Sequence, residues 1–527
     1  MSKAAKLART STRGGFNLFW GVAVSSLISA LGMMLVAGIL SEGEYGLFNI
    51  ALIVPNFVHI IRDLGVDQST IKYTAQYNEE NRPAQIRSIL AAAVSFESVF
   101  GLIFTAVSFF LSGYMATEIF GRPEVALYIQ LASFTIFGGA LSKIAESAFT
   151  GYEEMHYYSM VMVIRSILKT AIMIWLVVSG FGVHGAVIGH TLAWLITGII
   201  GIILLYFGFY RNLKKQDNQK LEIISTLKSM LRYGLPLSGS VILNGFMIQF
   251  YTFLVAIFLS DQIVGNYQVA FNFAALLGFF VIPVTTMLFP AFSKINAQKD
   301  PDTLRNLFQF SVKYSSLLIV PATFMMMALS QPAIATIFPG KYELTPLFLS
   351  TYIIVNLYTA FGSLSTGNLI KGQGRSDFHL KLTILQSILG VILGLILTPL
   401  YGVIGLISAN LISTIPYVII SLWWINKYYN ATIDWKSSIK ILFASMIAAA
   451  LTFTVVHISN LDSWVTLVVG AIIYTVTYLV SAPLIGAINK LDTRNLKEML
   501  KALGPVAPIF DIILYIIERL TVKFQRK

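Results

Sequence analysis

Ten ionisable side chains lie inside stretches of the sequence that are otherwise apolar enough to cross a membrane. An ionised group in hydrocarbon costs about 2.5 kcal/mol or more, so such residues face a water-filled cavity or a partner of opposite charge. Arginine offers phosphate oxygens a bidentate fork and lysine a point charge, so a cluster of these cations could bind a phosphate group. The six cations are Arg62, Lys72, Lys143, Arg165, Lys169 and Lys313, and the four acids are Asp63, Asp67, Glu97 and Glu146.

Spacing places several of these charges on shared helix faces. Arg165 and Lys169 are four residues apart and therefore share one face of a helix. Asp63 and Asp67 have the same spacing. The apolar run 47–61 that precedes the first pair of charges is too short to cross the bilayer at about 1.5 Å per residue, so the residues that follow it lie deep in the membrane.

Two interpretations of these charges are open. In an ion ladder, Asp63 and Asp67 pair with Arg165 and Lys169 across two packed helices. In a cationic cavity, the basic side chains instead face a phosphorylated ligand. The two arrangements can coexist if the acids release the cations when the substrate arrives.

The count of charges favours the cavity. Lys143 and Glu146 can pair locally at three-residue spacing, yet six cations still face only four acids. We therefore expect a hydrophilic cavity with more basic than acidic lining residues.

Uncharged polar side chains in the apolar stretches are candidates for lining a sugar site. Each is a weaker indication than a charge, because a single one is more often a helix-to-helix hydrogen bond worth about 0.6 kcal/mol. The six histidines show no metal-ligand spacing, cysteine is absent, and no nucleophile or nucleotide motif occurs. The sequence thus predicts no catalytic residue, no metal site and no cofactor. The sugar-lining candidates are Asn17, Asn244, Gln249, Gln268, Asn272 and Asn356.

The elements that position these residues are membrane-spanning helices. Hydrophobic residues make up 56% and charged residues 12% of the 527 residues, and the mean hydropathy is +0.74. Runs of about 20 apolar residues, the length that spans the bilayer core, recur along the chain. We expect an all-α polytopic membrane protein with about fourteen transmembrane helices.

An internal repeat organises these helices. The stretch LVAGILSEGEYGLFNIA at 35–51 recurs as LVAIFLSDQIVGNYQVA at 254–270, at an offset of 219 residues. Six helices per repeat is an even number, so both copies enter the membrane from the same side and form parallel lobes about an axis along the membrane normal. Two further landmarks recur at offsets of 221 and 220 residues, RSIL at 165–168 with QSIL at 386–389 and GVHG at 182–185 with GVIG at 402–405.

The repeat divides the chain into four parts. Residues 1–215 form an N-terminal six-helix lobe and residues 225–430 a C-terminal six-helix lobe. Residues 431–487 supply two extra transmembrane helices. Residues 488–527 form a cytoplasmic tail in which apolar residues lie on one side of a helix, which predicts an amphipathic helix on the inner membrane surface.

The net charge of +12 follows membrane topology rather than nucleic-acid binding. Most lysines and arginines lie in the amino terminus, in the loops after even-numbered helices and in the tail. The positive-inside rule therefore puts both termini in the cytoplasm. We expect a multi-pass protein of the cell membrane.

Several stretches carry a resemblance to a known family. GILSEGEYGLF and IIRDLGVDQSTIKYTAQY in the first lobe, and IKGQGRSDF with the later YGVIG in the second, resemble the polysaccharide flippases. These belong to the multidrug/oligosaccharidyl-lipid/polysaccharide exporter superfamily. The matching positions run from Leu40 to Gly46 and from Asp63 to Gly65. The resemblance implies two six-helix lobes, two extra helices, and cavity arginines that engage a pyrophosphate, although not at positions that match those of the related lipid II flippases.

The resemblance also implies a function. We expect a flippase, not an enzyme, that moves a polyprenyl-linked oligosaccharide, joined through phosphate or pyrophosphate, from the inner to the outer leaflet by alternating access. Such transport would serve polysaccharide or glycoconjugate assembly. The expected partners are the lipid-linked oligosaccharide, membrane lipids and other polysaccharide-assembly proteins, with no nucleic acid.

Two alternatives remain. A proton- or sodium-coupled drug or organic-cation exporter of the same superfamily is disfavoured by Arg62 and by the helix count. A membrane glycosyltransferase or polysaccharide polymerase is disfavoured by the short extracytoplasmic loops. The sequence leaves open the glycan, the lipid carrier, the coupling ion, a bacterial or archaeal source, the oligomeric state, and whether the buried charges bind substrate or one another.

Overall fold

The structure is a computed structural model that describes residues 3–62, 64–213, 223–459, 461–489, 492, 493 and 495. Within these residues all regular secondary structure is helical. A membrane offers no water to backbone N–H and C=O groups, and a helix satisfies them within one segment. The predicted all-α class is confirmed.

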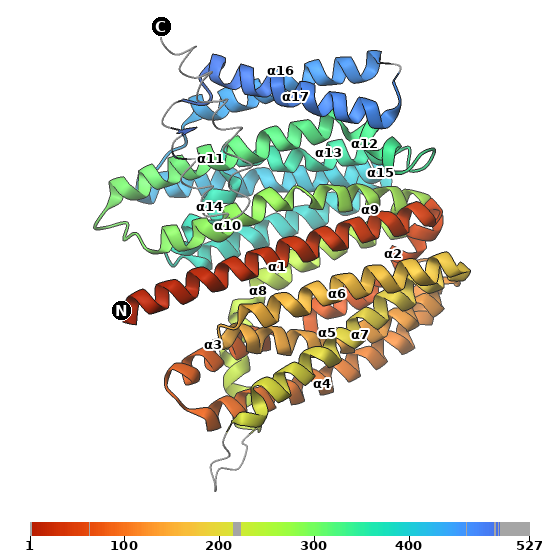
Figure 1. Cartoon of the computed structure of the whole chain (residues 1–527), viewed down its shortest axis with the longest axis vertical. Helices are drawn as coiled ribbons and strands as arrows, with labels where there is room; N and C mark the ends of the chain where they lie inside the picture. Colours follow the sequence, from red (N-terminus) through yellow and green to blue (C-terminus); the bar gives the residue numbers. More distant parts are fainter. Residues whose placement is uncertain are drawn as a thin grey trace. The chain divides into compact units, whose positions relative to one another are not determined.

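The chain divides into two compact units, residues 1–268 and residues 269–527. Within the first unit, α5 packs against α2, α3, α4, α6 and α7 and so occupies the centre, while α1 lies along α6 (Figure 1). The helices that begin in this unit are α1 (Lys3–Ile39), α2 (Glu42–Arg62), α3 (Val66–Glu79), α4 (Pro83–Tyr114), α5 (Val125–Gly151), α6 (Met155–Leu176), α7 (Gly182–Gly208), α8 (Ile223–Phe258) and α9 (Asp261–Ala275).

Glycines bring α5 and α7 close together. A Cβ added to Gly138 of α5 would lie 2.6 Å from the Trp194 backbone of α7. A Cβ added to Gly198 of α7 would lie 2.5 Å from the Gly138 carbonyl oxygen. Small residues let membrane helices approach closely, because helix association in lipid depends on packing rather than on water release.

The second unit contains helices on both sides of a 3₁₀ segment, η4 (Ile353–Phe361). Tyr474 of α17 donates a hydrogen bond of 2.7 Å from its hydroxyl to the Pro321 carbonyl oxygen of α11. Helices α16 and α17, which cover the two extra spans expected at 431–487, pack side by side (Figure 1). The helices of this unit are α10 (Gly278–Ser293), α11 (Pro301–Ala328), α12 (Ser330–Ile337), α13 (Thr345–Tyr352), α14 (Ser363–Gly372), α15 (Ser376–Tyr429), α16 (Trp435–Ile458) and α17 (Ser463–Ile485).

Ten segments of the described chain are long and apolar enough to cross a membrane, or eleven if Thr345–Phe361 and Ser363–Gly372, bent by 55°, form one span. Two of the ten, Met155–Asn212 and Ser376–Tyr429, are 58 and 54 residues long. At about 1.5 Å per residue each exceeds the roughly 30 Å hydrocarbon core more than twofold, so each must cross more than once. The protein is a multi-pass membrane protein, and the number fourteen stays a prediction.

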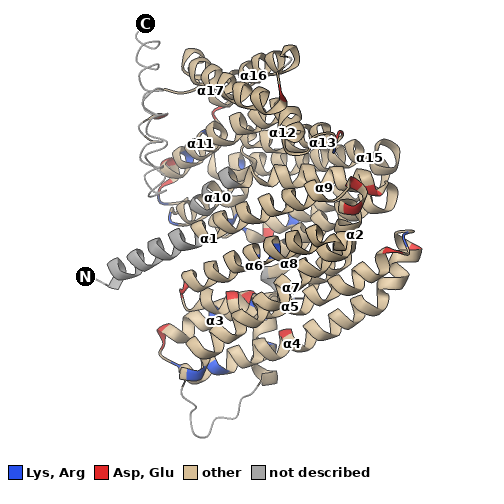
Figure 2. Cartoon of the chain, turned by 45° about the vertical axis from the view of Figure 1, so that its right-hand side comes forward, with Lys and Arg blue, Asp and Glu red and all other residues tan. Residues whose placement is uncertain are grey.

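The surface of these helices matches a lipid environment. Large apolar side chains are exposed on it, including Phe110 at 82% and Trp175 at 68%. Figure 2 shows most lysine, arginine, aspartate and glutamate residues near helix ends and connecting segments. The predicted tail at 488–527 lies almost wholly outside the described residues, so its amphipathic helix also stays a prediction.

Both long segments bend at equivalent glycines of the repeat. Gly182 has φ 51° and ψ −132°, and Gly402 has φ 60° and ψ −140°. Only glycine adopts this region without strain. The same rare conformation at an offset of 220 residues supports the predicted duplication, while the arrangement of the lobes stays a prediction.

The duplicated motif of the first unit contacts its own copy. A Cβ added to Gly46 would lie 2.0 Å from the Asp261 carbonyl oxygen, and one added to Gly265 would lie 2.1 Å from the Glu42 carbonyl oxygen. Gly265 is the repeat equivalent of Gly46, and Asp261 that of Glu42, so the contact is reciprocal. Asn266 adds a hydrogen bond of 2.7 Å from its side-chain amide to the Glu42 carboxylate.

This contact predicts different effects for two glycines of α2. Gly46→Ala should lower the free energy of unfolding by about 1 to 3 kcal/mol, because the added methyl group meets backbone that must shift. The control is Gly43→Ala, whose added Cβ would have its nearest neighbour, Gln262, at 3.9 Å. Thermal unfolding in detergent measures both, and equal stability of the two variants would contradict the close contact.

Candidate functional site

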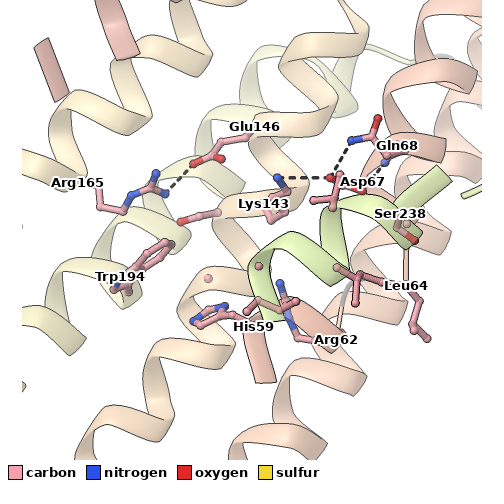
Figure 3. A pocket seen from close by; sticks show the side chains of 17 residues that line it. His59, Arg62, Leu64, Asp67, Gln68, Lys143, Glu146, Arg165, Trp194 and Ser238 are labelled. Atoms are coloured by element: carbon pink, nitrogen blue, oxygen red, sulfur yellow. Dashed lines mark hydrogen bonds and ion pairs between the residues drawn. The ribbon is translucent and has the colours of Figure 1, made fainter. Parts of the chain in front are cut away.

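A charged cavity of about 380 Å³ lies in the first unit (Figure 3). Helices α2, α3, α5, α6, α7 and α8 contribute its walls, so it is enclosed by segments far apart in the sequence. Among its described lining residues, three carry a positive charge and two a negative charge. Its lining consists of His59, Ile60, Arg62, Leu64, Gly65, Asp67, Gln68, Gly139, Ser142, Lys143, Glu146, Arg165, Trp194, Ser238, Val241, Ile242 and Gly245.

A break between α2 and α3 brings the first charges to the cavity. α2 ends at Arg62, and the chain turns through Leu64 at φ 48° and Gly65 at φ 83° before α3 begins. A Cβ on Gly65 would lie 2.3 Å from the backbone of Gly234, and one on Gly234 would lie 2.0 Å from the Gly65 carbonyl oxygen. The turn therefore needs glycine both for its conformation and for its contact with α8. Asp63, the remaining residue of this turn, lies outside the described residues.

Among the described residues, three ion pairs connect the helices around the cavity. Arg62 of α2 pairs with Glu97 of α4, and both side chains are at most 3% exposed. Asp67 of α3 lies 3.4 Å from the ammonium nitrogen of Lys143 on α5. The third pair joins α5 to α6, where a guanidinium nitrogen of Arg165 donates to the Glu146 carboxylate at 2.7 Å (Figure 3).

The partners in these pairs differ from the predicted ion ladder. Arg165 pairs with Glu146 and not with Asp67, and Asp67 pairs with Lys143. The reason is that α5 packs against both α3 and α6. Its residues Lys143 and Glu146 therefore reach different neighbours, Lys143 the Asp67 carboxylate and Glu146 the Arg165 guanidinium.

Three of the six predicted cations are not among the residues that line the cavity. The Lys169 ammonium group donates a hydrogen bond to the Ser29 hydroxyl of α1. The Lys72 ammonium group lies 3.7 Å from the centre of the Tyr233 ring. Neither has a carboxylate at salt-bridge distance among the described residues.

Lys313 is the third of these cations and is not among the residues that line the cavity, so its predicted role in binding substrate stays a prediction. It lies on α11 in the second unit and pairs with Asp492 at 2.7 Å. Asp492 lies beyond the last predicted span, so the charge count within the spans omitted this partner. Glu97 is also not among the lining residues, and it pairs with Arg62, which is one of them.

The predicted sugar-lining residues also lie elsewhere. None of those whose side chains the structure describes belongs to the cavity lining. The side chain of Asn17 lies outside the described part of the chain. The other candidates are Asn244 and Gln249 on α8, Gln268 and Asn272 on α9, and Asn356 in η4.

Aromatic residues that the sequence interpretation missed organise one wall. The Arg165 guanidinium lies 4.3 Å from the centre of the Trp194 ring, a cation–π contact. His59 packs against the same indole with a ring-centre distance of 5.5 Å. Trp194 in turn donates from its indole nitrogen to His190 at 3.2 Å. In the sequence, His59 lies three residues before Arg62, about one helical turn, and this spacing indicates that both side chains lie on the same side of α2.

Some polar atoms of the lining residues have no described partner. The buried atoms Nε2 of His59, Nε of Arg62 and Oγ of Ser142 lack a hydrogen bond among the described residues. A buried polar group left unsatisfied costs about 1 to 3 kcal/mol. A ligand with several acceptor oxygens and a donor could satisfy these atoms together.

Long apolar helices around an ionised internal cavity define the class, a polytopic membrane protein of the transporter type. Residues 35–345, more than half of the chain, match the family described as polysaccharide biosynthesis protein. The chain belongs to this family, which confirms the family predicted from the sequence.

Relatives and a solved structure extend the comparison. The Escherichia coli lipopolysaccharide biosynthesis protein WzxC is 22% identical over 75% of this chain and 78% of its own length. The probable flippase AglR of Haloferax volcanii is 21% identical over 78% of this chain and 81% of its own. The fold is similar to that of the lipid II flippase MurJ in an inward closed conformation, with a TM-score of 0.73, 16% identity, and coverage of 91% of this chain and 99% of MurJ.

The buried pairs predict a contrast in stability. Glu97→Gln should cost about 3 to 5 kcal/mol, because it leaves the Arg62 charge buried without its partner. Glu80→Gln is the control, since Glu80 pairs with Arg82 at 3.0 Å on the exposed surface, where such pairs contribute little. Thermal unfolding of the purified variants in detergent measures the difference, and a Glu97→Gln protein as stable as the control would refute a buried ion pair.

Proposed function

We propose that this protein is a flippase. It moves a polyprenyl-linked oligosaccharide, joined through phosphate or pyrophosphate, from the inner to the outer leaflet of the cell membrane by alternating access. The transport serves polysaccharide or glycoconjugate assembly, and both termini lie in the cytoplasm. The flippase name of AglR supports the activity, and the family description and the name of WzxC support a saccharide-bearing substrate.

The observation that carries the proposal is the cluster of Arg62, Lys143 and Arg165 on one cavity among apolar helices. Charge-assisted hydrogen bonds from such cations to phosphate oxygens are about twice as strong as neutral ones. A low-dielectric surrounding strengthens them further. Neutral side chains could not offset the charge of a phosphate group in this environment.

The size of the cavity restricts its occupant. Small-molecule sites usually measure about 300 to 1,000 Å³, and a volume of about 380 Å³ is near the lower limit. It suits a phosphate or pyrophosphate group with its nearest neighbours rather than a whole oligosaccharide or a polyprenyl chain. We therefore assign the head group to this cavity, with Arg62, Lys143 and Arg165 as its binding residues.

Loss of Arg165 should stop transport while the protein remains folded. Arg165→Gln removes charge-assisted hydrogen bonds worth about 1.5 to 3 kcal/mol, equivalent to a roughly 10- to 150-fold loss of affinity. The measurement is the initial rate of flipping of a fluorescent lipid-linked oligosaccharide in proteoliposomes. Arg375→Gln is the control, because Arg375 is exposed and lies outside the cavity lining. Unchanged flipping by Arg165→Gln would contradict the proposal.

A double variant separates substrate binding from a structural role. Arg165→Gln alone leaves Glu146 without its partner, and this loss of stability should be reversed when Glu146→Gln is added. If Arg165 binds the head group, transport should stay absent although thermal stability returns. Recovery of both stability and transport would show that Arg165 serves only to pair with Glu146.

A further inference from the structure

Arg165 is already engaged on two sides in the structure. One guanidinium nitrogen donates to Glu146, and the plane of the group lies against Trp194. Both Arg165 and Glu146 line the cavity. A phosphate group that approaches Arg165 therefore meets a carboxylate that occupies the same donor.

Glu146 depends on Arg165 for its charge balance. Its side chain is only 9% exposed, and no second side chain donates to its carboxylate among the described residues. The nearby basic side chains are committed elsewhere, since Lys143 pairs with Asp67 and Arg62 pairs with Glu97. A carboxylate displaced from Arg165 would be left as an isolated, buried negative charge.

We propose that Glu146 is an internal counter-ion that the phosphate head group of the substrate replaces at Arg165, and that Glu146 takes up a proton from water in the exchange. The inference rests on the proposed function and adds a residue that controls binding at the same site. The incoming anion brings negative charge and the proton removes that of the displaced carboxylate, so the charge of the cavity stays nearly balanced.

We next consider whether another titratable group near Glu146 could serve as the counter-ion of Arg165. Across the cavity lie His59 and Arg62 of α2 and Asp67 of α3, and Lys143 lies on α5 itself. Tyr158 of α6 is also within electrostatic reach of Glu146. From the two remaining neighbours of α5, α4 contributes Glu97, held by Arg62, and α7 contributes His190, which accepts from Trp194. Among the described residues, Glu146 is the carboxylate that pairs directly with the Arg165 guanidinium.

A purely structural pair makes the opposite prediction. If Glu146 only holds α5 to α6, its removal loosens the site and weakens or leaves unchanged the affinity for an anion. If Glu146 competes with the substrate, its removal frees the guanidinium and strengthens anion binding. The sign of the change in affinity therefore distinguishes the two roles.

Titration calorimetry on the detergent-solubilised full chain tests the exchange. The probes are farnesyl pyrophosphate and inorganic pyrophosphate, each measured at one pH in two buffers of different ionisation enthalpy. The wild-type protein should take up about one more proton per bound ligand than Glu146→Gln does, since ionisation of the ligand itself is common to both. Glu146→Gln should bind the probes about tenfold more tightly, equivalent to the loss of one competing charge-assisted interaction. Equal or weaker binding by Glu146→Gln, or equal proton uptake by the two proteins, would overturn the proposal.

Asp492→Asn is the matched control. Its pair with Lys313 has the same 2.7 Å distance as the Arg165–Glu146 pair and is similarly buried, but neither residue lines the cavity. It should leave probe affinity and proton uptake unchanged. A comparable gain of affinity in Asp492→Asn would show a general effect of loosening and would overturn the counter-ion role.

The outcome for wild-type protein keeps this inference separate from the proposed function. Absence of pyrophosphate binding by the wild-type protein would refute the head-group site and with it both proposals. Wild-type binding without the gain in Glu146→Gln would refute the counter-ion alone. If Glu146→Gln does not fold, proton uptake by the wild-type protein decides, and binding without uptake overturns the exchange.

The two probes also distinguish the source of the ligand. Tighter binding of farnesyl pyrophosphate than of inorganic pyrophosphate assigns the site to a lipid head group rather than to free pyrophosphate.

Discussion

An ionised side chain within a membrane protein must have a partner, and this constraint organises the first unit. Each of the three cavity pairs crosses from one helix to another: α2 to α4, α3 to α5, and α5 to α6. Removal of one partner from such a pair is far more costly than the net gain from forming it. The pairs therefore add little net stability, but they determine which helices can be neighbours in the folded protein. Two of the three pairs involve α5, because it lies at the centre of the unit.

The same constraint sets the conditions for binding a phosphate group. A cavity lined by unpaired cations would be unstable when empty, and a cavity with every cation permanently paired could not bind an anion. Pairs that differ in burial resolve this conflict. Arg62 and Glu97 are almost fully buried, whereas the side chains of Arg165 and Lys143, which also line the cavity, are 15% and 45% exposed. Exchange of partners is thus easier at Arg165 and Lys143 than at Arg62.

Much of this could be predicted from the sequence, but not the pairing. The helical class and the set of buried charges follow from apolar runs and from the residues that interrupt them, because these depend only on local composition. Which acid meets which base depends on which helices are neighbours, so the partners of Arg165 and Asp67 could not be deduced from spacing. Lys313 shows the same limit, since its partner Asp492 lies 179 residues away, outside every predicted span.

The duplication bears on why nine of the ten charges within the predicted spans, all except Lys313, lie in the first copy. Backbone constraints are retained in both copies, as the matching conformations of Gly182 and Gly402 show. The charge is not retained, because the repeat equivalent of Arg165 is Gln386, which donates to the Thr414 hydroxyl at 3.0 Å. Glycine geometry is needed wherever the fold turns, so it persists in each copy. A buried cation is costly and persists only where it has a partner or a ligand, which concentrates the candidate binding chemistry in the first copy.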